Sequence, residues 1–430
     1  MSSVSRIKDV IPYYNTIVLP KHWLSAAAAG VKYRFPAKKL RVIGVTGTNG
    51  KTTTCFMIWK MLNMAGRKAG LMTTVAWGVD ELHEQIEHMT TVDTKTLNSR
   101  MEQIQKMGAE FLVLEVTSHA MVQFRTLGVP IEIAVMTNVT HEHLDYHKTF
   151  ERYRAAKCRL FKKAKFGVVN ADDASARHFI KSVLGANAGG DGGGFDDKYI
   201  TYGIKSGEMR AAGVKLAADG VKYSCGDMKI ETRIPGEFNV YNSLAAACVG
   251  RKIGLTEKEI HDGLYALEEV EGRMNRVNMG QDFEVIVDYA HTPDAFLKVF
   301  KSVEGHEGRI LTVTGGAGRR DESTRAERGE IAGKYSDIVV ITEDDSRDED
   351  PEKIAQSFVE GAESVGKKLD QDLFVNLDRR SALEQILGMA HKGDLVLVLG
   401  KGHEKTILRA DGAHEFEDLK VVREVLKNLN

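Results

Sequence analysis

Short apolar runs alternate with longer segments of helical periodicity through most of the chain. Apolar runs of this length, bounded by glycine and polar residues, are typical of buried parallel strands. In the first half they predict strands at 41–45, 69–75, 111–116, 131–136 and 166–170, the last of which we expect to end the series. Apolar residues at three- and four-residue spacing predict helices at 51–65, 94–107 and 149–163. This alternation predicts a doubly wound parallel sheet.

The same alternation resumes in the second half. It predicts strands at 283–288, 309–314, 337–342, 372–376 and 394–399, and helices at 294–303, 324–335, 351–365 and 379–391. Between the halves we expect a glycine-rich surface loop at 185–197, antiparallel hairpins at 198–234, a helix at 239–251 and a hinge at 268–276. The predicted organisation is a short N-terminal segment (1–40), a central P-loop α/β domain (41–272) and a Rossmann-like α/β C-terminal domain (273–430).

The amino-acid composition limits the classes of protein to which this chain can belong. The chain has 430 residues, 43% of them hydrophobic and 28% charged, with a formal net charge of −1. This balance gives no electrostatic support for sequence-independent nucleic-acid binding. Four scattered cysteines predict reduced core thiols and a cytoplasmic location. No apolar run reaches 18 residues, so we expect no membrane span. We expect the apolar segment 23–31 to pack on the first domain, with a membrane or partner surface as the alternative.

One stretch carries the first candidate chemistry, the sequence RVIGVTGTNGKTTTCFM at residues 41–57. A buried strand, a turn from Gly47 to Gly50 and a helix from Lys51 would direct several backbone N–H groups into one concavity that favours phosphate. Lys51 adds a charge for the terminal phosphates, and the Thr52 hydroxyl suits Mg²⁺. Five residues, rather than four, separate Gly44 from Gly50, so the loop is a relative of the common P-loop.

Three further features point to a charged site beside this loop. Glu115 ends an otherwise apolar strand, where a carboxylate suits Mg²⁺, although a solvent-facing glutamate is the alternative. The three histidines of 141–147 raise the possibility of zinc, but no fourth ligand is evident. Lys157 falls on the apolar face of its predicted helix. A buried ammonium must meet a carboxylate or phosphate, be chemically modified, or extend to the surface.

The second half offers four polar loops at the ends of predicted parallel strands. They contain the sequences VDYAHTPD, TGGAGRRD, TEDDSR and LGKGHE. The carboxyl ends of parallel strands meet at one edge of a sheet, so these loops predict a second site of mixed charge. Mixed charge suits a zwitterion such as an amino acid.

Taken in order, these motifs resemble the ATP-dependent Mur ligases, most of all the type that adds the third residue of a muramoyl peptide. The resemblance rests on TGTNGKTT, LEVTSHAMVQFR, TNVTHEHLDYH, YRAAK, GEFNVYN, EGRMNRV, VDYAHTPDA, GGAGRRD and GKGHE, across about residues 41–408. It implies an amide ligase of peptidoglycan synthesis. The peptide carboxylate would attack the γ-phosphate of ATP to give an acyl phosphate, which the incoming amine would then attack. It also implies domain closure about the hinge, and a monomer or weak dimer.

The resemblance also implies roles for individual residues. The catalytic residues would be Lys51, Glu115, His143 and Lys157. ATP would contact Gly47, Thr48, Asn49, Gly50, Lys51, Thr52, Thr53, Asn239, Asn242, Arg273 and Asp288. Mg²⁺ would be held by Thr52, Glu115, His143 and a carbamylated Lys157. The muramoyl peptide would bind Thr90, Thr91, Ser118, Gln123 and Arg125. The incoming amino acid would bind Arg320, Asp345, Arg347, Gly400 and Glu404.

Two departures from the family pattern leave the substrates open. Only about 40 residues precede the P-loop strand, where the family carries a full-size UDP-binding domain. We therefore expect the donor to be held through its muramoyl peptide, a different carrier to be used, or a partner to supply the surface. Diaminopimelate-adding members read Asp-Asn-Pro-Arg where this chain has 344–347, DDSR. Arg347 could pair with a distal carboxylate of diaminopimelate, whereas Asp345 could hold the ammonium of lysine.

Two further functions stay open from the sequence. One is a Mur-type ligase that acts on a carrier without UDP, or on a polyglutamate-like substrate. The other is a protein that binds nucleotide without turnover and docks a partner through its first 40 residues. The set Lys51, Glu115, His143 and Lys157 argues against the second of these.

Overall fold

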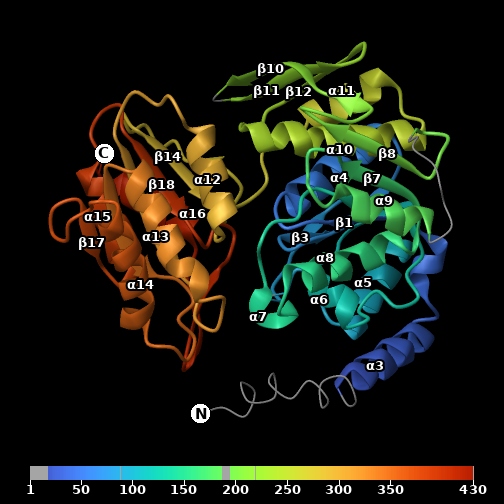
Figure 1. The fold of residues 1–430 in the computed structure, drawn as a ribbon, viewed down its shortest axis with the longest axis horizontal. Helices are drawn as coiled ribbons and strands as arrows, with labels where there is room; N and C mark the ends of the chain where they lie inside the picture. The colour runs from blue at the N-terminus through green and yellow to red at the C-terminus, as the bar shows by residue number, and fades with distance from the viewer. Residues whose placement is uncertain (1–17, 88, 186–193, 218, 430) are drawn as a thin grey trace. The chain divides into compact units, whose positions relative to one another are not determined.

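The computed structural model describes residues 18–87, 89–185, 194–217 and 219–429. The chain forms two compact units, Met1–Glu268 and Glu269–Asn430 (Figure 1). The predicted glycine-rich loop at 185–197 lies mostly outside the described residues. So does the first part of the predicted N-terminal segment.

Unit 1 is built on a sheet of order β4-β3-β2-β5-β1-β6-β7-β8-β9. Its strands are β1 (Arg41–Thr46), β2 (Ala69–Met72), β3 (Ala76–Gly78), β4 (Leu82–Glu84), β5 (Phe111–Glu115), β6 (Ile131–Met136), β7 (Ala164–Asn170), β8 (Tyr199–Gly203) and β9 (Met209–Arg210). Along the order β2-β5-β1-β6-β7-β8-β9, every neighbouring pair of strands is parallel. The pairs β2–β3 and β3–β4 are antiparallel. This confirms the predicted parallel sheet and places β1 at its centre.

Two strand predictions for unit 1 are wrong. β7 does not end the parallel series, because β8 pairs with it in parallel and β9 follows. Residues 199–203 therefore belong to the main sheet and not to a hairpin. Within 198–234, the antiparallel hairpins are formed by β10 (Ala212–Ala217), β11 (Gly220–Cys225) and β12 (Met228–Thr232). Residues 199–203 have too few apolar positions to stand out from the hairpins that follow.

Helices cover both faces of the unit 1 sheet. They are α3 (Leu19–Lys32), α4 (Lys51–Met64), α5 (Thr94–Lys106), α6 (Ser118–Val122), α7 (Leu144–His147), α8 (Phe150–Phe161), α9 (Ala176–Leu184), α10 (Glu237–Ile253) and α11 (Glu257–Tyr265), with the 3₁₀ turn η2 (Pro36–Lys39). Side chains of α5, α8 and α9 form one core with β1, β5, β6 and β7. On the other face α4 packs against α10 and α11. The sheet is therefore covered on both sides, which explains why its strands read as continuous apolar runs.

Unit 2 repeats this plan with a sheet of order β13-β14-β18-β15-β16-β17. Its elements are β13 (Asn275–Arg276), β14 (Glu284–Asp288), α12 (Pro293–Ser302), β15 (Ile310–Gly316), α13 (Ser323–Tyr335), β16 (Ile338–Glu343), α14 (Pro351–Ser364), β17 (Leu373–Val375), α15 (Arg379–Met389), β18 (Leu395–Leu399), β19 (Thr406–Arg409), β20 (Gly412–Glu415) and α16 (Asp418–Leu429). The five strands β14, β18, β15, β16 and β17 are parallel, as predicted. The hairpin β19–β20 and the helix α16 were not predicted.

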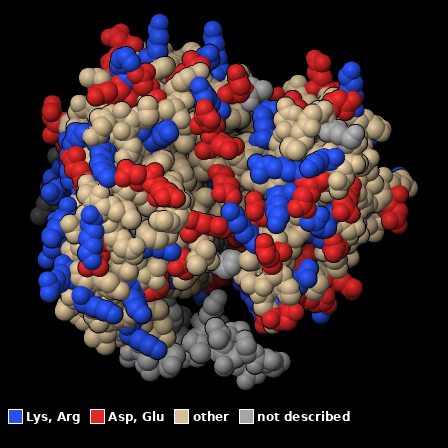
Figure 2. Space-filling view, turned by 180° about the vertical axis from the view of Figure 1, so that it is seen from behind, with Lys and Arg blue, Asp and Glu red and all other residues tan. Residues whose placement is uncertain are grey.

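Charged side chains of both signs lie interspersed over the face shown in Figure 2, in keeping with the net charge of −1. In the described part of the chain, no helix combines the length and the apolar character that crossing a bilayer requires.

A buried ion pair ties the last helix of unit 2 to the strand ends. Arg379 donates from Nε to Asp418 Oδ1 and from Nη2 to Oδ2, each at 2.7 Å. It also donates to the carbonyl oxygens of Glu343 and Leu399, which end β16 and β18. Both side chains of the pair have no exposed surface. The free-energy cost of removing this pair from water is offset only while both charged partners and their hydrogen bonds are present.

We expect Asp418→Asn to lower the free energy of unfolding by about 3–5 kcal/mol, because it leaves a buried guanidinium without its counter-ion. The matched control is Glu424→Gln. It breaks the exposed pair between Glu424 and Arg380 on the same two helices and should have no measurable effect. Urea unfolding followed by circular dichroism, with hydrogen exchange of α16, measures both. Equal effects of the two variants would contradict the assigned importance of the buried pair.

Candidate functional site

The loop between β1 and α4 is held by the residues that follow β6. Thr48 N–H donates to the Asn138 carbonyl at 2.8 Å, and Asn49 N–H donates to Asn138 Oδ1 at 2.9 Å. Thr137 Oγ1 donates to the Asn49 carbonyl at 2.7 Å. Gly50 has φ +82°, the left-handed region that favours glycine. Strand, turn and helix therefore follow one another as predicted, with the N-terminus of α4 at the loop, where backbone N–H groups favour an anion.

Glu115 lies beside this loop, as the sequence predicts. The strands β1 and β5 are neighbours, and Val45 pairs with Glu115 in register. Thr52 Oγ1 donates to Glu115 Oε2 at 3.0 Å, and the same oxygen accepts from the N–H and hydroxyl of Thr74. Glu115 is buried, so the alternative of a solvent-facing glutamate is wrong. A hydroxyl and a carboxylate that converge in this way are the hard oxygen donors that Mg²⁺ prefers.

Two other residues of the predicted set lie on the first turn of α4. Lys51 Nζ donates to the Thr48 carbonyl at 2.7 Å, so the ammonium is drawn back over the loop. Thr53 is buried on the same turn.

Lys157 is buried on the inner face of α8, as predicted. Its ammonium donates to the Gly47 carbonyl at 2.6 Å and lies 4.5 Å from the centre of the Tyr153 ring. The structure therefore excludes extension of this side chain to the surface. Burial, and after it the charge of Lys51, lower the pKa of Lys157 well below its ordinary value. Both effects disfavour the charged form of this side chain.

A hydrogen-bonded chain links the P-loop to the loop of the histidines. Thr48 Oγ1 lies 3.0 Å from the Tyr153 hydroxyl, which donates to Glu142 Oε2 at 3.1 Å. Glu142 Oε1 lies 3.6 Å from Nε2 of His143. His143 thus lies beside the phosphate loop's hydrogen-bond partners, where the resemblance places a Mg²⁺ ligand.

The histidines of this loop do not form a zinc site. His141 stacks on Phe150 with ring centres 4.8 Å apart, whereas His147 Nε2 lies 2.9 Å from Ser118 Oγ. Burial lowers the pKa of His147 to about 4, so it is neutral at physiological pH. His143 and His147 both lie against His119 and Tyr153, whereas His141 is separated from them on Phe150, which the sequence spacing alone did not show.

The residues predicted for the muramoyl peptide gather at the end of β5. Thr91 Oγ1 donates to the Glu115 carbonyl at 2.9 Å, and Arg125 donates to the Thr91 carbonyl. Arg125 Nε also donates to Gln123 Oε1 at 3.1 Å. Thr90 precedes this group and is half-buried. With Ser118 at the start of α6, they form one polar cluster beside the P-loop.

The remaining residues predicted for ATP fall in both units. In unit 1, Asn242 Nδ2 donates to Asn239 Oδ1 at 2.8 Å, and Asn242 Oδ1 accepts from Thr54 of α4 at 3.2 Å. In unit 2, Arg273 stacks on Tyr289 at 4.7 Å from the ring centre. Asp288 accepts from two backbone N–H groups there, at 2.7 and 2.8 Å.

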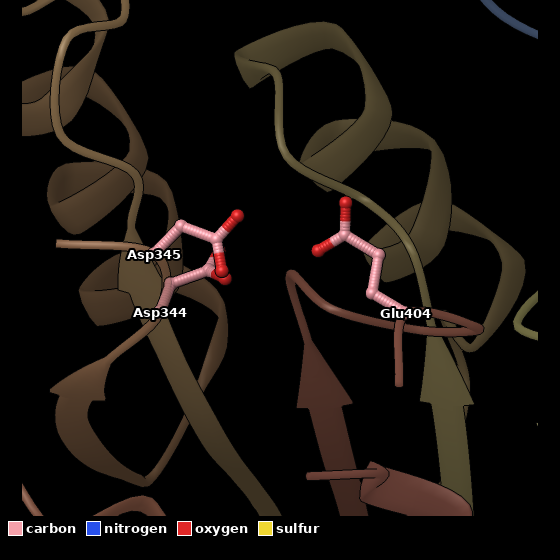
Figure 3. Close-up of side chains that lie close together, drawn as sticks. All are labelled: Asp344, Asp345 and Glu404. Atoms are coloured by element: carbon pink, nitrogen blue, oxygen red, sulfur yellow. The ribbon is translucent and has the colours of Figure 1, made fainter. Parts of the chain in front are cut away.

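The four polar loops of unit 2 meet at one edge of its sheet, as predicted. Parallel register brings Asp288 opposite Leu399 and Gly316 opposite Glu343. Figure 3 shows Asp344 and Asp345 facing Glu404 across this edge. Lys401 Nζ contacts all three carboxylates, at 3.2 Å from Asp344, 2.9 Å from Asp345 and 3.0 Å from Glu404. Asp345 Oδ1 also accepts from the backbone N–H of Leu408 at 3.0 Å.

The other residues predicted for the amino acid surround this cluster. Arg347 Nη2 lies 3.8 Å from Asp345, and Nη1 donates to the Gly318 carbonyl at 2.6 Å. Burial, followed by the charge of Arg320, lowers the pKa of Arg347. Arg320 is exposed, and a Cβ added at Gly400, which has φ +116°, would lie 3.2 Å from Asp344 Oδ2. Asp345 is therefore already paired, which the sequence did not indicate.

Sequence reasoning missed several polar residues of both sites. Tyr153 and Glu142 form the chain between the P-loop and His143, His147 holds Ser118, and Lys401 joins the carboxylates of unit 2. Tyr153 was read only as an apolar position. For Lys401 a signal existed, because a lysine between two glycines directly after the apolar run of β18 has little room to leave the interior.

Comparison with known proteins shows which families share this arrangement. The Mur ligase middle domain matches residues 45–250, and the glutamate ligase domain of Mur ligases matches residues 272–402. A UDP-N-acetylmuramoyl-L-alanyl-D-glutamate–2,6-diaminopimelate ligase of Syntrophomonas wolfei is 37% identical over 413 residues, which cover 94% of this chain and 81% of that protein. A UDP-N-acetylmuramyl-tripeptide synthetase of Roseiflexus is 36% identical over 426 residues, covering 94% and 82%.

Solved structures agree with these relatives. One diaminopimelate ligase of the same description has a TM-score of 0.61 and 32% identity, covering 91% of this chain and 79% of that chain. A folylpolyglutamate synthase of Mycobacterium tuberculosis, complexed with ADP and AMPPCP, has a TM-score of 0.70 at 15% identity and covers 94% of each chain. At that identity the second likeness shows a shared fold alone.

A single methyl group at position 50 should disturb the phosphate loop. An alanine Cβ there would lie 2.4 Å from Asn242 Oδ1, which is buried and bonded to Thr54. We expect Gly50→Ala to cost more stability than Gly66→Ala. The control shares a positive φ of +73° but has open space around it, so it carries only the conformational cost of about 1–2 kcal/mol.

Thermal unfolding and calorimetric titration with ADP measure both variants. Gly50→Ala should also weaken ADP binding, whereas Gly66→Ala should leave it unchanged. Equal stability and equal ADP affinity in the two variants would contradict the close packing of the loop against Asn242.

Proposed function

The chain belongs to the Mur ligase family of ATP-dependent ligases, and we propose that it adds the third amino acid to a UDP-N-acetylmuramoyl dipeptide in peptidoglycan synthesis. The observation that carries this proposal is the pairing of Thr52 with Glu115 beside the P-loop, within a chain that matches tripeptide-forming relatives over more than nine-tenths of its length. The added residue is diaminopimelate, with lysine as the alternative.

The first chemical step needs a carboxylate and the γ-phosphate of ATP to be held together. The loop amides and Lys51 bind the phosphates and stabilise the negative charge that develops during transfer. The peptide carboxylate attacks phosphorus, ADP leaves, and an acyl phosphate results. Thr91, Ser118, Gln123 and Arg125 bind the muramoyl peptide at the neighbouring strand end. The amine of the incoming amino acid then attacks the acyl carbon, and phosphate leaves.

Residues fit for Mg²⁺ are present at the P-loop. Thr52 and Glu115 offer oxygen donors 3.0 Å apart, and His143 lies close to the same loop through Glu142 and Tyr153. When bound, Mg²⁺ supplies positive charge that neutralises the phosphates. We propose Thr52, Glu115, His143 and Lys157 as the residues that hold it.

Lys157 fits a chemical modification better than an ion pair. Its partners are a carbonyl and an aromatic ring, and its pKa lies well below the ordinary value. A neutral amine attacks CO₂ to give a carbamate and releases one proton. The product is an anion with oxygen donors in a place where an ammonium is poorly compensated.

The charges of unit 2 favour diaminopimelate. Arg347 offers a guanidinium to a second carboxylate, whereas Asp345 is already paired with Lys401. Asp345 therefore has less capacity for the ammonium of lysine than its sequence position suggests. Arg320, Gly400 and Glu404 complete the proposed amino-acid site of unit 2. Asn239 and Asn242 of unit 1 stay predicted ATP contacts, as do Arg273 and Asp288 of unit 2.

Phosphate release with a panel of amino acids tests the proposed reaction. With Mg-ATP and UDP-muramoyl-dipeptide we expect diaminopimelate to stimulate release most, and glutamate not to stimulate it. The same panel with free muramoyl dipeptide tests whether the donor must carry UDP. Absence of amino-acid-dependent phosphate with every combination would overturn the proposed function.

Replacement of Lys157 tests its proposed role. We expect Lys157→Met to reduce the ligase rate by about 100-fold or more, because charge stabilisation at the phosphates is lost. The control is Lys163→Met, since Lys163 is an exposed lysine that follows the same helix and donates to the Thr126 carbonyl at 3.5 Å. Full activity of the Lys157→Met variant would contradict the proposed role of Lys157 and would leave the description of the fold unchanged.

A further inference from the structure

Lys401 carries the one buried ammonium in the candidate amino-acid site of unit 2, among the residues that the structure describes there. Its side chain has no exposed surface, and its Nζ lies within 3.2 Å of carboxylate oxygens of Asp344, Asp345 and Glu404. Burial opposes its charge, but the three carboxylates raise its pKa above the ordinary value. Lys401 is therefore a permanent cation inside the site.

The carboxylates around Lys401 have the spacing of a cation site. Oxygens of Asp344, Asp345 and Glu404 all lie within 4.8 Å of one another, and Figure 3 shows them directed toward a common centre. The Lys401 ammonium contacts all three. The chain thus supplies its own cation at a place where three acidic side chains would otherwise attract a metal ion or a cationic ligand.

The same ammonium offsets part of the negative charge of the site. Lys401 contacts the carboxylates of Asp344, Asp345 and Glu404, Arg347 lies 3.8 Å from Asp345, and the buried Arg328 adds a cation that acts on Asp344. A site whose carboxylates already face cations of the chain suits a zwitterion with equal numbers of carboxylates and ammonium groups. An amino acid with an additional ammonium and no additional carboxylate would meet acidic groups that are already paired.

We propose that Lys401 is a specificity-determining residue, an internal counter-ion that disfavours amino acids whose side chain ends in an ammonium alone. The proposal rests on the proposed function. Removal of the Lys401 charge makes the site more negative by one unit and should favour lysine. Removal of the Asp344 charge makes it more positive by one unit and should favour diaminopimelate.

Two variants with opposite charge effects test the proposal in the full chain. The measured quantity is the ratio of kcat/KM for lysine to kcat/KM for diaminopimelate, from phosphate release. We expect Lys401→Met to raise this ratio by about tenfold, and Asp344→Asn to lower it by a similar factor. A residue that only supports the fold would weaken both reactions together and leave the ratio unchanged.

Two controls complete the design. Lys401→Arg keeps the charge and should keep the wild-type ratio, and Lys392→Met removes an exposed lysine and should leave both rates unchanged. If the Lys401→Met variant does not fold, the Asp344→Asn variant still tests the proposal. An unchanged lysine-to-diaminopimelate ratio of kcat/KM in that variant overturns it. Failure of the proposed function is distinct, because then the wild-type protein releases phosphate with neither amino acid.

Discussion

Both units bury charged side chains at the carboxyl ends of parallel strands, and such charges must be matched within the fold. In unit 1, Glu115 accepts hydrogen bonds from Thr52 and Thr74. In unit 2, Lys401 forms ion pairs with three carboxylates and Arg379 is paired with Asp418. An unmatched charge at any of these positions would cost several kcal/mol. The candidate chemistry and the stability of the strand ends therefore depend on the same contacts.

The fold could be predicted from the sequence wherever a strand is buried on both faces. Runs such as 111–116 and 394–399 contain hardly any polar residue, and both became central strands of the expected sheets. β8 was assigned to a hairpin because its sequence, YITYG, mixes aromatic, branched and polar residues. Contacts between segments distant in the sequence place β8 beside β7, and the local pattern of apolar residues cannot predict such contacts.

The candidate sites could be predicted in part for a similar reason. Glu115 and Lys157 stood out because a charged residue in an apolar pattern requires an explanation. The pairing of Asp345 with Lys401 could not be predicted, because it joins two loops 56 positions apart whose approach depends on the order of strands. The roles of the individual site residues stay predictions, whereas the ligase family and the α/β fold are confirmed by the relatives and the structure.

The contacts of Asp345 have a consequence for protein engineering. This carboxylate is held by Lys401 from the loop after β18 and by the backbone of Leu408 in β19. A graft of residues 344–347 from a relative with another amino-acid preference would therefore transfer only one part of a three-segment arrangement. Successful exchange of substrate preference would require the segments 344–347, 400–404 and 406–409 to be transplanted together as one cassette.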